Sequence, residues 1–223
     1  MKKITLEFQR AYEKTIIDSS IENLPLRLQV FIYLCFFPGT NINRLSKVLK
    51  CTSTTVRWHI KKLMEKKLIQ FYETKTRKYF FPAKFVDVKD YPIFMVLGEP
   101  STRVIVRHIY EHHQSSKKSI IALVNEPVNK LTKILNRLTA LHLIEKYNTG
   151  REVIYMPNRR LTELIEFYKN RPKSFIEFMR NILTEFGVEI IKSEEYLLHG
   201  IYTSENDEKI SVEVPITPFN GIL

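Results

Sequence analysis

The amino-acid sequence predicts a mainly α-helical protein with small β-elements, in which one arrangement of three helices and a hairpin occurs twice. Three observations lead to this fold class. Apolar residues recur at one-turn helical spacing in several segments. Short aromatic and β-branched runs flank polar turns. The chain also matches itself without a gap at an offset of 75 residues, which is the signature of an internal repeat.

The first arrangement, residues 24–85, begins with two predicted helices. Pro25 suits the start of a helix that Pro38-Gly39 ends. A short helix is expected over residues 43–50, with Leu45, Val48 and Leu49 facing inward.

A third helix follows Thr52, whose hydroxyl suits a helix start. Val56, Ile60 and Leu63 form its buried stripe. The face opposite the stripe, which includes Glu65, is mostly hydroxyl, aromatic and cationic, which suits contact with phosphates and base edges. The alternative is an ordinary solvated face. For Trp58 the alternative is packing against a neighbouring helix. The candidate contact residues are Ser53, Thr54, Thr55, Arg57, Trp58, Lys61 and Lys62.

Two strands are predicted over residues 68–72 and 78–81, joined by a basic turn that contains Lys75, Arg77 and Lys78. With this hairpin, residues 24–82 resemble the winged helix-turn-helix family, in particular archaeal transcription regulators of the ArsR or MarR type. The resemblance implies that residues 53–63 are a recognition helix, that the turn is the wing, and that double-stranded DNA is the partner.

The self-alignment extends this interpretation to residues 99–157. It pairs Pro25 with Pro100 and Pro82 with Pro157, and it preserves the apolar stripe of the third helix. We therefore predict two tandem winged helix-turn-helix domains, with residues 86–98 as the linker. The stripe of the second copy is Leu131, Leu135 and Leu138.

The second copy differs where a nucleic acid would bind. Lys133 takes the position of Trp58, the turn shortens to residues 148–152, and Glu126-Pro127 places a carboxylate at the helix start. An auxiliary DNA reader and a surface for a protein partner both remain open. The candidate contacts are Asn129, Lys130, Lys133, Asn136, Arg137 and Arg151.

Outside the repeat, residues 1–23 suggest a short strand and a helix with a packing or dimerising role. Residues 158–187 predict two amphipathic helices, the first capped by Asn158 and the second ended by Gly187. Because such helices need a partner surface for their apolar faces, a homodimer is one expectation. Residues 188–223 read as an acidic β tail with a turn over residues 204–208.

The net charge of +11 favours polyanionic partners, among which DNA competes with ribosomal and membrane surfaces. Its distribution is uneven. Residues 24–82 contain twelve Lys or Arg against two Glu, and residues 99–157 contain nine against five. Residues 187–223 contain two Lys against seven acidic residues. The first unit is therefore the expected DNA-binding surface.

Several classes are disfavoured. Cys35 and Cys51 lack CxxC spacing, and His108, His112 and His113 lack a further ligand cluster, so no metal or cofactor is expected. Neither a glycine-rich phosphate loop nor a GxSxG motif occurs, which argues against an enzyme. No signal-peptide core or long apolar run is present, so we expect a cytoplasmic protein with no membrane contact.

The function expected from these patterns is sequence-specific regulation of transcription, with the first recognition helix in the major groove and the wing on the backbone. Arg57, Thr54 and Thr55 would reach base edges, and Lys61, Lys62, Arg77 and Lys78 would anchor phosphates. The competing hypothesis is a winged-helix protein-interaction module of a transcription or chromatin assembly, which binds the transcription machinery.

Overall fold

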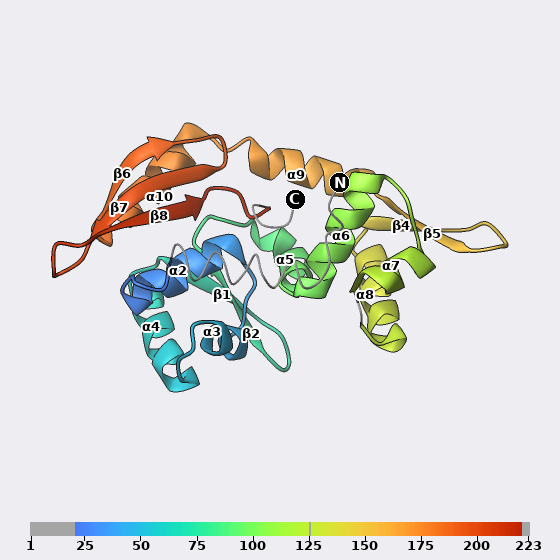
Figure 1. The fold of residues 1–223 in the computed structure, drawn as a ribbon, viewed down its shortest axis with the longest axis horizontal. Coiled ribbons are helices and arrows are strands. Elements are labelled where there is room, and N and C mark those ends of the chain that lie inside the picture. The colour runs from blue at the N-terminus through green and yellow to red at the C-terminus, as the bar shows by residue number, and fades with distance from the viewer. Residues whose placement is uncertain (1–20, 125, 220–223) are drawn as a thin grey trace.

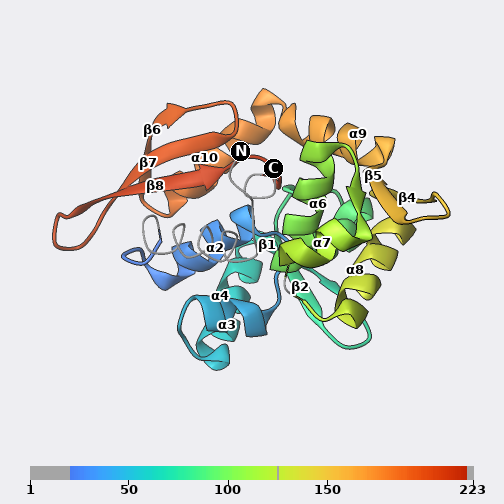
Figure 2. The same ribbon diagram turned by 45° about the vertical axis from the view of Figure 1, so that its right-hand side comes forward.

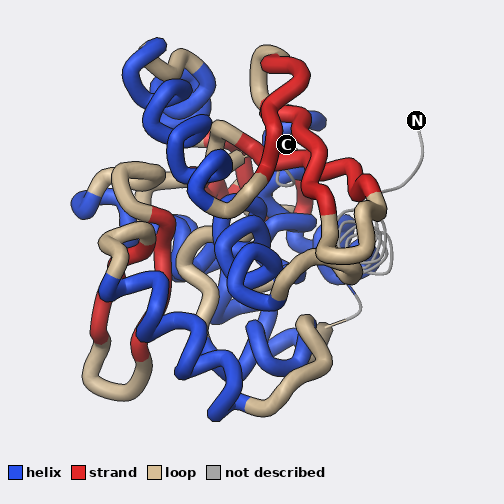
Figure 3. The backbone as a smooth tube through the Cα atoms, turned by 90° about the vertical axis from the view of Figure 1, so that its left-hand side faces the viewer, coloured by secondary structure: helices blue, strands red, loops and turns tan. Residues whose placement is uncertain are grey.

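Helices predominate in the computed structural model, which describes residues 21–124 and 126–219. The strands of this described part form three small antiparallel sheets (Figure 3). The strand and helix expected within residues 1–23 lie outside the described residues, apart from a turn at 21–23.

The first unit, residues 24–85, has the predicted order of three helices and a hairpin. Its helices are α2 (Leu26–Phe36), α3 (Ile42–Val48) and α4 (Ser53–Glu65), and its strands are β1 (Ile69–Glu73) and β2 (Lys78–Pro82) (Figure 1). Helix α2 is the core element, because Leu28 and every residue from Val30 to Phe36 are buried. It has no solvated face from Val30 onward, which is more burial than its sequence pattern predicts.

The second unit, residues 99–157, repeats this order. It contains α6 (Pro100–His112), α7 (Lys117–Val124), α8 (Val128–Ala140), β4 (Ile144–Asn148) and β5 (Val153–Pro157) (Figure 2). A two-residue strand, β3 (Ser115–Ser116), pairs with β5.

Strand pairing repeats residue by residue between the two units. Ile69 pairs with Pro82 in the first hairpin and Ile144 pairs with Pro157 in the second, and all five pairs of β1–β2 recur 75 residues later in β4–β5. The isolated bridge between Thr40 and Phe80 recurs as the pairing of Ser115 with Tyr155. The offset read from the sequence therefore corresponds to a shared backbone register.

Residues 86–98, predicted as a linker, are folded and largely buried. They contain the 3-10 helix η1 (Val88–Asp90) and the helix α5 (Tyr91–Leu97). The Tyr91 ring stacks on Phe81 with centroids 3.9 Å apart, so this segment covers one face of the first hairpin. Burial raises the pKa of Tyr91 to about 12. The sequence predicted a linker here without a helix, because its uniform apolar run, residues 93–97, has no amphipathic period.

A buried guanidinium joins the two units. Arg103 on α6 is 1% exposed, and it donates from Nε to the Leu97 carbonyl at 2.5 Å and from Nη2 to the Gly98 carbonyl at 3.1 Å. The guanidinium carbon lies 3.9 Å from the centroid of the Phe37 ring, at the end of α2. Carbonyl oxygens and an aromatic face together offset part of the cost of burying the charge.

The C-terminal module, residues 158–219, packs onto the first unit and the connection. It comprises α9 (Arg159–Lys169), α10 (Lys173–Glu185), β6 (Val188–Ser193), β7 (Leu197–Thr203) and β8 (Lys209–Pro215). Asn158 caps α9 by accepting from the backbone N–H of Arg160, as predicted. Gly187, at φ +80°, ends the helical region.

The apolar faces of the two C-terminal helices are used within the chain. Phe186 lies 5.5 Å from Phe31 of α2, and Tyr168 lies 5.5 Å from Phe94 of α5, both measured between ring centroids. The Tyr168 hydroxyl also donates to the buried carboxylate of Asp90 at 2.7 Å. These faces therefore pack within the chain and do not support the expected homodimer. The homodimer stays a prediction.

In Figures 1 and 2 the acidic sheet β6–β8 lies above α2, α4 lies below α2, and α8 lies across the molecule from the sheet. Among the described residues, no helix combines the length and apolar character needed to cross a bilayer.

Two glycines with the same backbone conformation allow a matched test of the contact between α5 and the first unit. A Cβ on Gly39, at φ +78°, would lie 2.8 Å from the carbonyl carbon and oxygen of Phe94, whereas a Cβ on Gly150, at φ +81°, meets no atom within 4 Å. We expect Gly39→Ala to lower the free energy of unfolding by about 3 kcal/mol or more. Gly150→Ala should cost only about 1–2 kcal/mol, the left-handed penalty itself. Urea unfolding followed by circular dichroism measures both, and equal losses would contradict the close packing of α5.

Candidate nucleic-acid interface

Helix α4 begins at a hydroxyl cap, as the sequence predicts. Thr52 is extended, and its Oγ1 accepts from the backbone N–H of Thr55 at 3.1 Å. A cap of this kind contributes about 1 kcal/mol. Val56, Ile60 and Leu63 are buried, which confirms the predicted inward stripe. The cap and the stripe together fix which residues of α4 face outward.

The outward face of α4 holds the residues proposed to contact DNA. Ser53, Thr54, Arg57, Trp58 and Lys61 are exposed, and Thr55 and Lys62 are partly exposed. This burial pattern agrees with the helical-wheel prediction.

Glu65 lies among the cations of this helix, and the sequence reasoning assigned it no role. The Lys62 ammonium is 2.8 Å from Glu65 Oε2, and the Lys61 ammonium is 4.0 Å from Glu65 Oε1. The hydrogen bond from Lys62 is the main cause of a lowered pKa at Glu65. The carboxylate is therefore ionised and pairs with two of the cations that are predicted to contact DNA.

The turn of the first hairpin, residues 74–77, is closed by one threonine. The Thr74 backbone N–H donates to the Arg77 carbonyl at 2.9 Å, and Thr74 Oγ1 accepts from the Arg77 N–H at 3.1 Å. Lys75 and Arg77 are exposed at the tip. Lys78 is the first residue of β2, where its ammonium lies 3.4 Å from Glu73 and 4.7 Å from the centroid of Phe71.

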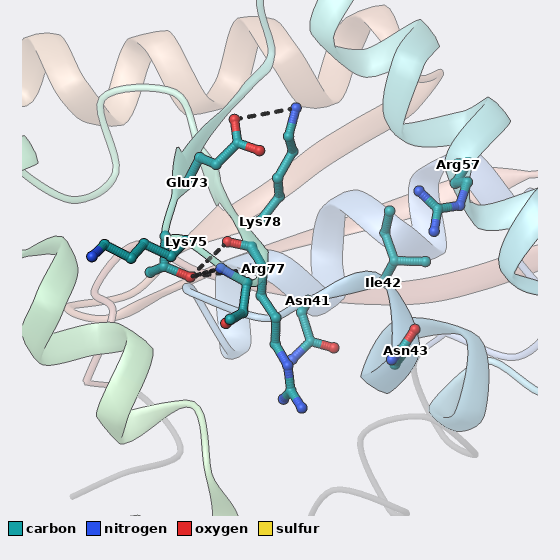
Figure 4. Close-up of a pocket in the computed structure, with 10 residues that line it drawn as sticks. Asn41, Ile42, Asn43, Arg57, Glu73, Lys75, Arg77 and Lys78 are labelled. Carbon is teal, nitrogen blue, oxygen red and sulfur yellow. Dashed lines mark hydrogen bonds and ion pairs between the residues drawn. The ribbon is translucent and has the colours of Figure 1, made fainter.

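A cleft of about 360 Å³ lies between this turn, the start of α3 and Arg57 of α4. Figure 4 shows Arg57 on one side, Lys75 and Arg77 on the other, and Asn41 and Asn43 between them. The structure thus brings one predicted contact of the helix, Arg57, and the predicted contacts of the turn to one cationic concavity, and the other predicted residues of α4 do not line it.

Asn41 and Asn43 are lining residues that the sequence reasoning missed. Asn41 is the cap of α3, and its Oδ1 accepts from the Arg44 N–H at 3.1 Å. The signal that could have found it is an Asn directly before a short helix.

An apolar groove of about 500 Å³ lies on the other side of Arg57, between α4 and the hairpin. Its lining includes Ile60, Met64, Phe71 and Lys61, and Arg57 and Lys78 line both this groove and the first cleft. Phe71 is 39% exposed there. The cationic residues therefore separate a polar cleft from an apolar one.

The recognition-like helix of the second unit starts differently. Pro127 precedes α8 without a side-chain cap. The Glu126 carboxylate accepts from Ser101 Oγ at 2.5 Å and from the Lys130 ammonium at 2.8 Å. An internal anion thus occupies the helix start and pairs with Lys130, one of the predicted contacts. The other predicted residues of this helix, Asn129, Lys133, Asn136 and Arg137, are exposed.

The turn of the second hairpin is not shortened, contrary to the prediction, because Asn148 pairs with Val153 as Glu73 pairs with Lys78. It has the same backbone hydrogen bond as the first turn and a different charge. The Thr149 N–H donates to the Glu152 carbonyl at 3.0 Å, as Thr74 does to Arg77. Glu152 stands where Arg77 stands in the first unit, and Arg151 is the exposed cation beside it. The second turn is therefore close to neutral.

The cysteines and histidines considered as candidate ligands in the sequence form no metal site among the described residues. Burial raises the pKa of the Cys35 thiol well above its usual value, and that of Cys51 to a lesser degree. His108 and His112 lie with ring centroids 4.2 Å apart on α6. Within the described residues, no three His, Cys, Asp or Glu side chains are grouped to hold a metal ion.

Comparison with known proteins finds a distant relative among transcription regulators. No family model matches the chain. An uncharacterised HTH-type transcriptional regulator of Methanocaldococcus jannaschii is 24% identical over 146 residues, which cover 64% of this chain and 35% of that protein. The chain therefore spans about a third of the length of the curated relative it matches.

Solved structures with partial similarity include three bacterial proteins. The transcriptional regulator SlyA is 19% identical over 61% of this chain and 89% of its own. FabT of Streptococcus pneumoniae, solved in complex with DNA, is 16% identical over 60% and 90%, and MepR of Staphylococcus aureus is 20% identical over 59% and 90%. Each has a TM-score of 0.26. A score of this size does not establish a shared fold.

The ion pairs of Glu65 lead to a prediction about affinity. Glu65→Gln removes a negative charge from α4 and releases Lys61 and Lys62, so affinity for a DNA duplex should rise roughly threefold to tenfold at low salt. Glu163→Gln is the matched control, because Glu163 is exposed on α9 and pairs with Arg159 at 2.6 Å. Fluorescence anisotropy with a labelled duplex measures both. Unchanged or weaker binding by a folded Glu65→Gln protein would contradict this role.

Proposed function

We propose that this chain is a sequence-specific, double-stranded DNA-binding regulator of transcription with two tandem winged helix-turn-helix units. The first unit is the DNA reader. Helix α4 enters the major groove, where Arg57, Thr54 and Thr55 reach base edges, and the turn of residues 74–77 lies on the adjacent backbone.

The convergence of helix and turn on one cationic cleft carries this proposal. Arg57, Lys75 and Arg77 come from two elements and line the same concavity, with Asn41 and Asn43 between them. A duplex that brings a base edge to α4 brings its phosphates to the turn. The charge of residues 24–82, twelve cations against two anions, supports the same surface.

A homodimer and contact with the transcription machinery belong to the proposal as further steps. Two units in one chain already offer two recognition-like helices, so a single copy could span neighbouring grooves. Measuring the mass in solution with and without DNA separates these arrangements.

A second candidate function concerns residues 99–157. We favour a protein-interaction role for this unit, because Glu126 occupies the start of α8 and Glu152 replaces the cation of the turn. Under this reading the first unit binds DNA and the second binds a partner of the transcription or chromatin machinery.

The salt dependence of binding tests the first unit. Each phosphate contact contributes roughly 0.9 to the slope of log affinity against log salt, so Lys61→Ala and Arg77→Ala should each lower affinity and reduce the slope by about that amount. Arg159→Ala is the control, since it removes an exposed cation from α9. If neither variant differs from the control, the docking of α4 and the turn is wrong.

The same titration divides the two roles of the second unit. Replacing Lys133 and Arg137 together by Ala should leave both affinity and slope unchanged if this unit binds protein, and should reduce the slope by roughly two contacts if it reads DNA. A shift assay on DNA upstream of the chain's own gene against an unrelated duplex tests sequence specificity. Equal binding to both would favour an assembly role.

A further inference from the structure

Trp58 is the single tryptophan of the chain and is 51% exposed on the outward face of α4. Its hydration is costly, because a large apolar ring stays in contact with water. Tryptophan at such a position is typical of contact surfaces, where it is enriched among the residues that dominate binding. Neither a phosphate nor a guanine edge explains an indole at this position.

The indole is held from two sides. The guanidinium carbon of Arg27, at the start of α2, lies 5.4 Å from the ring centroid of Trp58. The His59 ring meets it edge-on, with centroids 4.8 Å apart and planes at 85°. Burial, and then the charge of Arg27, lowers the pKa of His59. The orientation of Trp58 is therefore set before any ligand arrives, by a residue of the core helix.

The position of Trp58 on α4 places it beside a predicted phosphate anchor. At 3.6 residues per turn, Trp58 and Lys61 lie about 60° apart around the helix axis. Arg57 lies about 100° from Trp58, on the same side as Lys61, so a helix that lays Arg57 and Lys61 into a major groove brings this ring to the base edges beyond Lys61. The apolar group exposed in the major groove is the C5-methyl of thymine.

We infer that Trp58 is a specificity-determining residue that contacts thymine methyl groups, and that Arg27 is the positioning residue that holds it. The inference rests on the proposed function of the first unit. It adds an apolar contribution that salt does not screen, whereas the lysine and arginine contacts are salt-dependent. Discrimination would favour A·T pairs beyond the positions read by Arg57, on the side of Lys61.

The test compares two duplexes that differ only in the methyl group. One contains alternating A·T pairs, and the other contains deoxyuridine in place of every thymine, so that any register offers the contact in the first and lacks it in the second. Wild-type protein should bind the thymine duplex about fourfold more tightly for each methyl group buried. Trp58→Ala should bind both duplexes equally while it keeps the wild-type salt slope.

Arg27 is tested by the same ratio. Arg27→Lys keeps the charge and loses the planar guanidinium, so it should reduce discrimination and leave the salt slope unchanged. Emission from the only tryptophan reports directly on the ring: it should change on binding DNA, and it should shift in free Arg27→Lys. Arg159→Ala, on α9, should alter neither the ratio nor the emission.

The outcomes separate this inference from the proposed function. Salt-dependent binding with equal affinity for both duplexes, or discrimination that survives Trp58→Ala, overturns the inference and leaves the DNA-binding proposal intact. Failure to bind any duplex at low salt overturns both. Loss of discrimination in Trp58→Ala and Arg27→Lys, with the slope retained, is the expected result.

Discussion

One buried cation holds the two halves of this chain together. The guanidinium of Arg103 leaves water completely, and its hydrogen bonds to the carbonyls of Leu97 and Gly98 fix the end of α5 against the start of α6. Its contact with Phe37 connects that junction to the end of α2. Removing one partner from such a site leaves a desolvated charge, which is among the more destabilising changes a core can suffer. The relative position of the two units depends on this arrangement.

Helix α2 extends the same constraint to the C-terminal module. Because β8 packs against it and Phe186 contacts Phe31, α2 serves as the core of the first unit and as the docking site of the module. The Tyr168 hydroxyl and the Asp90 carboxylate make a second link, between α9 and η1. A helix buried on these sides cannot shift without disturbing α4, and Arg27 connects Trp58 to this helix.

The ends of helices and their buried faces could be predicted from the sequence, because capping residues and apolar spacing are local signals. Thr52, Asn158 and Gly187 marked element ends, and Val56 with Ile60 marked an inward face. The repeat at an offset of 75 residues was visible because equivalent positions in the two copies carry identical or similar residues. The outward residues of α4 and of the turn were assigned correctly as exposed. That they contact DNA stays a prediction.

The remaining features depend on contacts between residues distant in sequence. Local spacing does not mark Arg103 as a core residue, and only its three-dimensional surroundings show that it is buried. The folded connection was missed because a uniformly apolar run such as residues 93–97 has no period to identify it. Asn41, Asn43 and Glu65 are part of the candidate site because they lie close to its cations in the folded chain. The packing of α10 on α2 likewise has no counterpart in local spacing.

Because the two hairpins share one register, each unit can serve as the structural reference for the other. Arg77 and Glu152 occupy one backbone position in two copies of the same turn, and Trp58 and Lys133 occupy another in two copies of the same helix. The hairpin register is the same across the first pair, while side-chain chemistry varies. What the two units bind can therefore be compared position by position within a single polypeptide and under a single set of solution conditions.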